Sequence, residues 1–357
     1  MGKKGRLAKM KDIHFKSEPQ KREGKPEFDD LPAALIEKIE SLIGDKIIKS
    51  EMAWGGYSAS FSILADTEQQ GRFFIKGSHP EETAHGFKML EQEITAYQNI
   101  DILKSISPEY IGYVSLGGED DWHLGIWRAV PNGYIKTALQ DQDLRLIAAR
   151  LKFIYQNFNP ESHDIHAAED TNFIQNILSG KMGWEKFDGN IDRIENFTKG
   201  FEDEAAARSW LDKNLQNLID LSLQKADQHM RTLLHFDLRT DNMLFDDKGQ
   251  VWFIDWPNAC VGPAVYDLVY LVGELSLRGN GSCADIYQKL IDYTGLSVPD
   301  RDVKIALSQI SGFLALSFYR DIPEKLPRLR WLQGGMLITL SDWMNHLKMS
   351  DSLPRIR

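Results

Sequence analysis

Cysteine is scarce in this chain of 357 residues, which contains only Cys260 and Cys283 and no Cys-x-x-Cys pair. This excludes a disulfide-stapled fold and a cysteine-based zinc site, and fits a reducing, cytoplasmic environment. No apolar run approaches the roughly 18–20 residues that span a bilayer, so we expect no membrane segment. The N-terminus also lacks the apolar core of a secretory signal. Hydrophobic residues at 42% and charged residues at 26% are typical of a soluble globular protein.

Excess positive charge is confined to the start of the chain. Residues 1–25 hold nine Lys or Arg against three Asp or Glu, a net charge of +6; the whole chain carries −10, which leaves −16 for the remainder. Nucleic-acid binding needs a basic face for phosphate contacts, so the acidic body argues against it. An acidic body is compatible with a cationic small-molecule partner. We interpret residues 1–27 as a basic, disordered tail. The sequence carries no signal for an oligomeric state.

Hydrophobic periodicity divides the rest of the chain into a strand-rich part, residues 28–130, and a helix-rich part, residues 131–357. In the first part the patterns predict strands at 57–64, 72–75, 111–114 and 122–127, with helices at 35–43 and 87–97. In the second part apolar stripes predict helices at 144–154, 211–221, 303–319 and 332–347. We therefore predict an α+β, two-lobed fold with a small sheet lobe, one main helix against it and a larger, mostly helical lobe.

The most informative motif is His235-Phe-Asp-Leu-Arg-Thr-Asp-Asn242, which is followed by a strand-like run that closes at Asp255. It resembles the catalytic loop and the metal-binding aspartate of the kinase fold. Asp237 is placed to orient or deprotonate a hydroxyl group. His235 alone is more often a hydrogen-bonded core residue than a catalyst, so we interpret it as a structural residue that holds the loop.

A hairpin is predicted directly after this motif. The apolar runs Met243–Phe245 and Val251–Ile254 flank the turn-forming Asp246-Asp-Lys-Gly249. If the two runs pair antiparallel, Asn242 and Asp255 lie side by side at the open end. An amide oxygen and a carboxylate suit Mg²⁺, which prefers oxygen ligands. These two residues are therefore the predicted metal ligands.

Features of the first lobe are typical of a nucleotide site. Gly55 and Gly56 allow close backbone approach to phosphates, and Ser58 follows as a hydrogen-bond donor. Lys76 ends the second predicted strand, where a kinase keeps the lysine that contacts phosphates. Glu93 lies within the apolar stripe of the following helix and is its expected partner, since an inward carboxylate needs a cation.

Two further interpretations concern this lobe. Glu91 is an alternative partner of Lys76, but helical geometry places Glu91 about 160° around the helix from Glu93, on a different face. The segment Ile126–Val130, with Arg128 and Val130, is expected to be the hinge that offers backbone groups to the nucleobase of ATP or GTP.

Motifs of regulated protein kinases are missing. Phe236 stands where the arginine of His-Arg-Asp would contact a phosphorylated activation loop, and no Asp-Phe-Gly or Ala-Pro-Glu follows Asp255. The chain instead runs within a few residues to Gly262-Pro-Ala-Val-Tyr-Asp267-Leu268. Without a peptide-docking segment, the site is better suited to a small substrate than to a protein.

At this point the sequence resembles the aminoglycoside phosphotransferase family of kinase-like small-molecule phosphotransferases, over roughly residues 45–275. By this resemblance Asp237 is the catalytic base, Asn242 and Asp255 bind Mg²⁺, Lys76 holds phosphates of ATP or GTP against Glu93, and Asp267 is structural. Relatives phosphorylate aminoglycosides, choline, amino alcohols, sugars and other hydroxylated metabolites. The basic C-terminal stretch Leu353–Arg357 weakens a drug-resistance interpretation, since several resistance enzymes form an acidic pocket there.

Other interpretations stay open. A non-catalytic nucleotide-binding module would be marked by loss of Lys76, Asp237 or Asp255, yet all three are present. The cluster His163, Asp164 and His166 suggests a metal hydrolase, but it lacks the helical His spacing of such sites. Side chains that could line a cleft for a cationic substrate, more typically a solvated face, are Glu161, Asp164, Glu169 and Asp170. Trp256 and Tyr266 are better explained by core packing than by stacking on a substrate.

Overall fold

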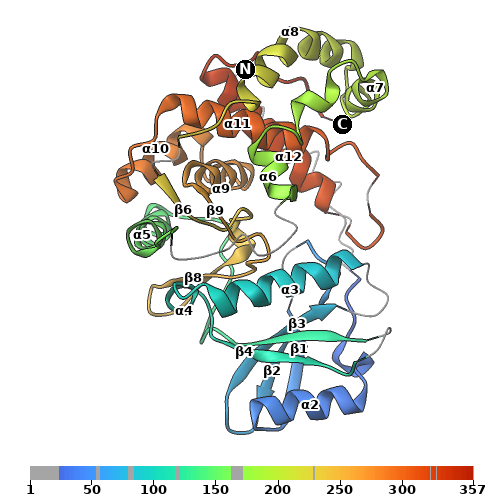
Figure 1. The fold of residues 1–357 in the computed structure, drawn as a ribbon, viewed down its shortest axis with the longest axis vertical. Coiled ribbons are helices and arrows are strands. Elements are labelled where there is room, and N and C mark those ends of the chain that lie inside the picture. Colours follow the sequence, from blue (N-terminus) through green and yellow to red (C-terminus); the bar gives the residue numbers. More distant parts are fainter. Residues whose placement is uncertain are drawn as a thin grey trace.

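The computed structural model describes residues 24–53, 57–78, 84–117, 121–161, 172–227, 230–321, 323–326 and 328–356. Two lobes follow one another along the long axis, with the sheet at one end and most of the helices at the other (Figure 1). The chain leaves the sheet after Arg128 and enters the first long helix of the second lobe at Asp141. The predicted division at residue 130 falls in this connection.

The N-lobe is built on a five-stranded antiparallel sheet with the strand order β1-β2-β3-β5-β4. Its strands are β1 (Ile47–Met52), β2 (Phe61–Thr67), β3 (Arg72–Ser78), β4 (Tyr110–Ser115) and β5 (His123–Arg128). Four of the five were predicted within a few residues. Strand β1 was missed because it lies at the edge of the sheet with all of its side chains exposed or half-buried, so its sequence shows no clear alternation.

Helices cover both faces of this sheet. On the face away from the C-lobe, α2 (Ala33–Ile43) buries Leu35 and Ile39 in a core with β2 and β3, and it ends at Gly44, whose φ of 76° is the left-handed geometry of a helix C-terminus. On the other face lies α3 (Ala84–Asn99), followed by the short α4 (Leu103–Ile106) (Figure 1). Apolar side chains of α3 belong to the large core of the C-lobe, so this helix joins the two lobes.

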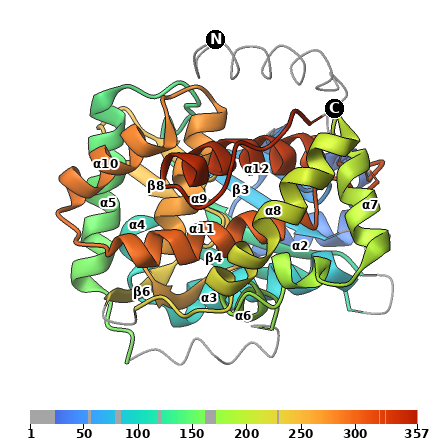
Figure 2. The same ribbon diagram turned by 90° about the horizontal axis from the view of Figure 1, so that it is seen from above.

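The C-lobe is mostly helical, and in the second view its helices overlie the sheet (Figure 2). Its helices are α5 (Asp141–Asn157), α6 (Asn172–Leu178), α7 (Ile191–Lys199), α8 (Glu204–Ser222), α9 (Val265–Leu277), α10 (Cys283–Thr294), α11 (Asp300–Ala315) and α12 (Leu329–His346). Short 3-10 turns are η1 (Phe28–Asp30) in the N-lobe and η3 (Trp184–Phe187) and η5 (Thr240–Asn242) in the C-lobe. The four helices predicted for this lobe correspond to α5, α8, α11 and α12. Helix α9 was missed because it is buried on nearly all sides and so lacks a polar face.

Two small antiparallel pairs lie between the sheet and the helices. Strand β6 (Arg231–Leu234) pairs with β9 (Cys260–Pro263), and β7 (Met243–Phe245) pairs with β8 (Val251–Phe253). The second pair is the predicted hairpin, one residue shorter than expected. Between β6 and β7 runs the segment 235–242, which is thereby held at the boundary of the two lobes (Figure 1).

The long helices of the described residues are too polar to qualify as bilayer-crossing segments.

Candidate active site

The loop 235–242 is held by hydrogen bonds to the first turn of α9. The carboxylate of Asp267 accepts hydrogen bonds from the backbone N–H groups of His235 and Phe236, both at 2.8 Å. Burial raises the pKa of Asp267, and the two donors oppose that rise. Phe236 has a φ of 57°, a left-handed conformation that a bulky residue adopts only where its surroundings enforce it. Asp267 therefore stabilises a strained turn immediately before Asp237.

Asp237 faces a guanidinium and an amide. Nη1 of Arg239 lies 2.5 Å from Oδ1 of Asp237, and Nδ2 of Asn242 donates to the backbone oxygen of Asp237 at 2.8 Å. Burial raises the pKa of Asp237 to about 6, while the charge of Arg239 opposes the rise. At neutral pH the group is therefore mostly ionised, and it can accept a proton.

Lys76 of β3 links the N-lobe to Asp255, which follows β8 in the C-lobe. Its ammonium contacts Oε2 of Glu93 at 2.8 Å and Oδ1 of Asp255 at 2.5 Å. Glu93 is buried on α3, whereas Glu91 is exposed, so the choice of Glu93 over Glu91 matches the observed ion pair. Burial alone would lower the pKa of Lys76, but the two carboxylates outweigh it and raise the pKa, so Lys76 is a permanent cation.

Asn242 and Asp255 have the donor chemistry of a magnesium site. The Ile254 N–H donates to the Asn242 carbonyl at 3.0 Å, which places the two ends of the hairpin next to each other. The amide nitrogen of Asn242 donates hydrogen bonds to Asp237, so the amide oxygen of Asn242 points away from Asp237. No described residue donates a hydrogen bond to that amide oxygen. Lys76 occupies one carboxylate oxygen of Asp255. Two protein oxygens fit Mg²⁺, which keeps waters and substrate phosphates as its other ligands.

His235 has the structural environment expected of it. Its Nε2 lies 2.8 Å from the backbone oxygen of Ile254, and burial lowers its pKa, so the ring is neutral. Trp256 and Tyr266 are buried, and their polar atoms bond to Ser107 and Gln309. Both are core residues, as the sequence favoured.

The predicted nucleotide contacts are less completely described. Gly55 and Gly56 lie outside the described residues. Ser58 is exposed, and its hydroxyl contacts that of Ser60 at 2.6 Å. The Arg128 side chain binds the carboxylate of Glu109 and the carbonyl of Gln70, and the Arg128 N–H donates to the Glu109 carbonyl. Val130 follows β5 and accepts a turn hydrogen bond from Gly133.

Two alternative interpretations, a cleft for a cationic substrate and a metal hydrolase, depend on acidic and histidine residues between 161 and 170. Most of these residues lie outside the part of the chain that the structure describes. His163, Asp164, His166, Glu169 and Asp170 fall outside the described residues. Glu161 is exposed, with its carboxylate 3.7 Å from Nη1 of Arg231.

A network of polar residues that was not predicted from the sequence surrounds the loop 235–242. The buried Glu274 of α9 accepts hydrogen bonds from the Thr240 hydroxyl at 2.9 Å and from Nε of Arg278 at 2.8 Å. Arg278 in turn donates to the hydroxyl of Tyr57, and the guanidinium of Arg239 lies 5.1 Å from the centre of the Tyr57 ring. Two signals for this network were visible in the sequence: a charged Arg239 inside the loop and Glu274 in a largely apolar segment.

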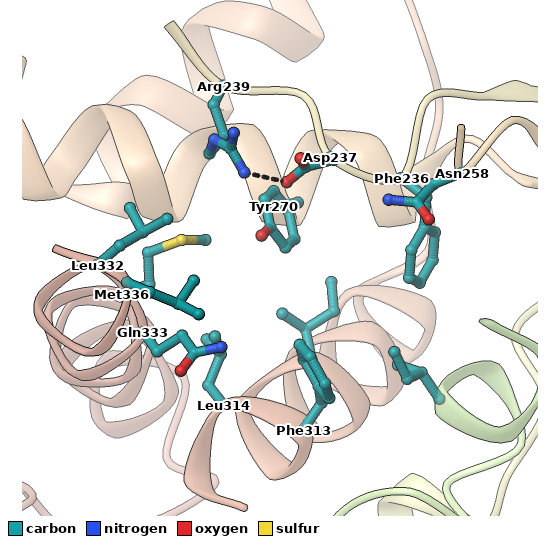
Figure 3. A pocket seen from close by; sticks show the side chains of 13 residues that line it. Phe236, Asp237, Arg239, Asn258, Tyr270, Phe313, Leu314, Leu332, Gln333 and Met336 are labelled. Carbon is teal, nitrogen blue, oxygen red and sulfur yellow. Dashed lines mark hydrogen bonds and ion pairs between the residues drawn. The ribbon is translucent and has the colours of Figure 1, made fainter. Parts of the chain in front are cut away.

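A cavity of about 170 Å³ opens beside Asp237. Figure 3 shows the Asp237–Arg239 ion pair on one side and Phe313 and Leu314 of α11 on the other. Helix α12 contributes Leu332 and Met336. The cavity lies where a molecule could present a hydroxyl group to Asp237.

Comparisons with known proteins agree with this arrangement. The description of the matching family is "phosphotransferase enzyme family" (APH), and the match covers residues 53–302. No curated protein sequence matches the chain. Among solved structures, a spectinomycin phosphotransferase bound to ADP and spectinomycin superposes with a TM-score of 0.55, 17% identity and coverage of 85% of this chain and 92% of its own.

Two other solved structures give similar values. The GDP complex of aminoglycoside 2′-phosphotransferase-IIIa has a TM-score of 0.56 and 18% identity, with 86% of this chain and 97% of that one covered. For choline kinase LicA from Streptococcus pneumoniae the TM-score is 0.52 and the identity 14%, with coverages of 87% and 98%. These likenesses confirm the predicted two-lobed kinase-like fold. With the family match spanning well over half of its length, the chain belongs to the phosphotransferase enzyme family (APH).

Proposed function

We propose that this phosphotransferase moves the γ-phosphoryl group of Mg-ATP or Mg-GTP to a hydroxyl group of a small molecule. The observation that carries the proposal is the convergence of Asp237, Asn242, Asp255 and Lys76, which come from both lobes. Similar structures hold ADP, AMP or GDP, which supports a nucleotide co-substrate.

Asp237 is the proposed base. The hydroxyl oxygen of the acceptor forms a bond to the γ-phosphorus, the bond from that phosphorus to the β–γ bridging oxygen breaks, and the acceptor proton passes to the Asp237 carboxylate as the nucleoside diphosphate leaves. The transition state of phosphoryl transfer is loose, so most of the rate comes from positioning and charge neutralisation.

The cationic and metal-binding groups are proposed to hold the nucleotide. Lys76 draws negative charge from the phosphates while Glu93 keeps it in place. Mg²⁺ held by Asn242 and Asp255 would neutralise charge on the phosphate oxygens. Gly55, Gly56 and Ser58 are proposed to contact phosphates, and the backbone around Arg128 and Val130 to contact the nucleobase.

The test is release of nucleoside diphosphate from Mg-ATP or Mg-GTP with a panel of aminoglycosides, amino alcohols, sugars, nucleosides and aryl alcohols. Asp237→Asn should reduce acceptor-stimulated turnover by at least about 100-fold, the size of a general-base contribution, and leave nucleotide binding largely intact. Asp212→Asn, on the exposed surface of α8, is the matched control and should behave as the wild type.

Near-normal turnover of Asp237→Asn would contradict the assignment of the base. Tight Mg-ATP binding without any transfer would favour the non-catalytic nucleotide-binding module instead.

A further inference from the structure

Arg239 is a buried cation beside the proposed base, and the proposed mechanism does not yet use it. Its side chain is only 7% exposed, and it lies two residues after Asp237 in the loop 235–242. Figure 3 shows the guanidinium and the Asp237 carboxylate facing each other at the edge of the cavity. Among the described residues that line this cavity, Arg239 is the one cationic side chain.

Asp241 fixes the orientation of this guanidinium. Nε of Arg239 donates to Oδ1 of Asp241 at 2.9 Å, and Nη2 donates to Oδ2 at 3.2 Å, so the carboxylate takes one edge of the planar group. Nη1 reaches Oδ1 of Asp237 at 2.5 Å. Burial alone would lower the pKa of Arg239, but the two carboxylates outweigh it and raise the pKa, so the side chain stays a cation.

The guanidinium has more donors than these two carboxylates use. It carries five N–H groups in one plane, and the contacts with Asp241 and Asp237 use three of them. The hydroxyl of Tyr270, on the cavity wall, also interacts with Arg239 and Asp237. At least one N–H group is left, on the part of the guanidinium that Asp241 does not cover. Arg239 can therefore bind a further oxygen anion while it keeps its contact with Asp237.

The transferring phosphoryl group has to come close to this donor. In the proposed mechanism the acceptor oxygen lies about 2.6–3.2 Å from the Asp237 carboxylate, and the γ-phosphorus about 3–3.5 Å from that oxygen. Arg239 contacts the same carboxylate, so its guanidinium is within reach of the phosphoryl oxygens. The ring of Tyr57, which directly follows the glycines proposed to contact phosphates, lies 5.1 Å from the guanidinium carbon. Arg239 is thus flanked by the base and by the proposed phosphate-binding segment.

The charges around Asp237 favour such a contact. Asp237, Arg239 and Asp241 are two carboxylates and one guanidinium, so together they carry a net charge of −1. The oxygens of a γ-phosphoryl group brought against Asp237 are repelled unless a cation lies beside them. Lys76 is bound to Asp255, on the nucleotide side of the proposed site. In GTPases, an arginine that contacts the transferring phosphoryl group raises the rate by about 10³–10⁵.

We propose that Arg239 is a further catalytic residue, which binds an oxygen of the γ-phosphoryl group while Asp241 holds the guanidinium in place. The inference rests on the proposed phosphotransferase function and adds a residue to its mechanism. The acceptor oxygen forms the bond to the γ-phosphorus, the bond to the β–γ bridging oxygen breaks, and the acceptor proton passes to Asp237. Arg239 keeps all of its protons throughout, and Asp241 is a positioning residue.

Binding of two nucleotides tests this contact, because only one of them carries a γ-phosphate. Calorimetry on the full chain measures the Kd of the Mg²⁺ complexes of the nucleoside diphosphate and of the β,γ-imido triphosphate, with the nucleobase, adenine or guanine, that binds more tightly. Arg239→Gln should weaken triphosphate binding by at least about tenfold, as for loss of a hydrogen bond to a charged group, and change diphosphate binding by less than about threefold. Equal effects on both nucleotides, or no effect on either, overturn the inference.

Two further variants separate this role from a structural one. Arg208→Gln removes an exposed arginine that pairs with Asp212 on α8, and it should leave both Kd values unchanged. The double variant Arg239→Gln, Asp241→Asn removes one cation and one carboxylate, so the net charge beside Asp237 stays the same. It should show the same selective loss, and it gives the answer if Arg239→Gln fails to fold, which thermal unfolding reveals. Wild-type affinity of the double variant for the triphosphate overturns the inference.

Asp241→Asn tests the positioning role by itself. Arg239 is kept but held less firmly, and triphosphate binding should weaken by about threefold or more. The double variant should bind the triphosphate no more weakly than Arg239→Gln, because Asp241 acts only through Arg239. Additive losses in the double variant would contradict the positioning role.

Nucleoside diphosphate release separates this inference from the proposed function. Acceptor-stimulated release that depends on Asp237, with wild-type triphosphate preference in Arg239→Gln, keeps the phosphotransferase and overturns the role of Arg239. A triphosphate preference that depends on Arg239, without transfer to any acceptor, keeps the contact and contradicts the proposed function.

Discussion

The hydroxyl of Tyr57 accepts a hydrogen bond from Nη2 of Arg278 at 2.9 Å, although 221 positions separate the two residues. Tyr57 precedes β2 in the N-lobe, and Arg278 follows α9 in the C-lobe. The same Tyr57 ring lies under the guanidinium of Arg239, which in turn contacts Asp237. One side chain of the N-lobe is thus connected to the catalytic loop by two routes.

Replacing Tyr57 separates these two routes. Tyr57→Phe removes only the hydrogen bond, and we expect kcat/KM to fall by about fivefold, since such a bond contributes about 1 kcal/mol. Tyr57→Ala also removes the ring contact with Arg239, and a fall of about tenfold is expected. Steady-state kinetics measure both. Tyr113→Ala, at an exposed residue of β4, should leave the kinetics unchanged. Equal values for Tyr57→Ala and the wild type would contradict the role of the contact.

Substitutions of Lys76 and Glu93 are predicted to have non-additive effects on the free energy of unfolding, whereas phosphoryl transfer is lost whenever Lys76 is replaced. Lys76→Met leaves the buried Glu93 without its cation, and the free energy of unfolding should fall by about 3 kcal/mol. Adding Glu93→Gln removes the unpaired charge and should recover about half of that loss or more. Phosphoryl transfer should stay absent in both variants, because neither has a cation for the phosphates. Urea denaturation measures the first effect, and additive losses in the double variant would refute the coupling.

Asp255 is predicted to set the affinity for Mg²⁺. Its φ of 70° is left-handed, a conformation that Asn adopts as readily as Asp, so Asp255→Asn changes the ligand charge with little backbone strain. We expect the Mg²⁺ concentration for half-maximal transfer to rise by about tenfold or more. Titration of the metal after treatment with EDTA measures this. An unchanged midpoint would show that Asp255 does not bind the metal.

Asp267 is predicted to contribute through the backbone of the catalytic loop. Asp267→Asn replaces one of two accepting oxygens with an NH₂ group that faces an N–H donor. The free energy of unfolding should decrease by about 3 kcal/mol, as for loss of a buried, charge-assisted hydrogen bond. Chemical denaturation measures the change against the exposed Asp212→Asn. A loss equal to that of the control would mean that the loop does not depend on Asp267.

The parts of the protein that could be predicted from the sequence are those with local signals. The hairpin of β7 and β8 follows from two short apolar runs around a turn, and it brings Asn242 beside Asp255. Glu93 could be chosen over Glu91 because helical periodicity separates their faces. The two-lobed fold could be predicted because the spacing of apolar residues changes from a strand-like pattern in residues 28–130 to a helical one in residues 131–357.

The missed parts depend on distant residues. Helix α9 is buried on nearly all sides and has no exposed polar face, so periodicity could not distinguish it from a buried strand. The contacts of Tyr57 with Arg278 and of Glu274 with Thr240 join segments whose meeting no local pattern encodes. The acidic cleft for a cationic substrate was weighed from composition alone, whereas the apolar wall of the cavity appears only when α11 and α12 are brought against the catalytic loop.

The residues of the candidate site come from two lobes that can move relative to each other. Asp237, Asn242 and Asp255 belong to the C-lobe, and Asp267 anchors the loop within that lobe. Lys76 belongs to the N-lobe and reaches Asp255 only while the two lobes stay close. In the proposed mechanism, a hinge movement between the lobes would therefore shift Lys76 relative to Asp255 and leave Asp237 and the cavity beside it unchanged. The acceptor would then be recognised by a surface that is already assembled before the nucleotide arrives.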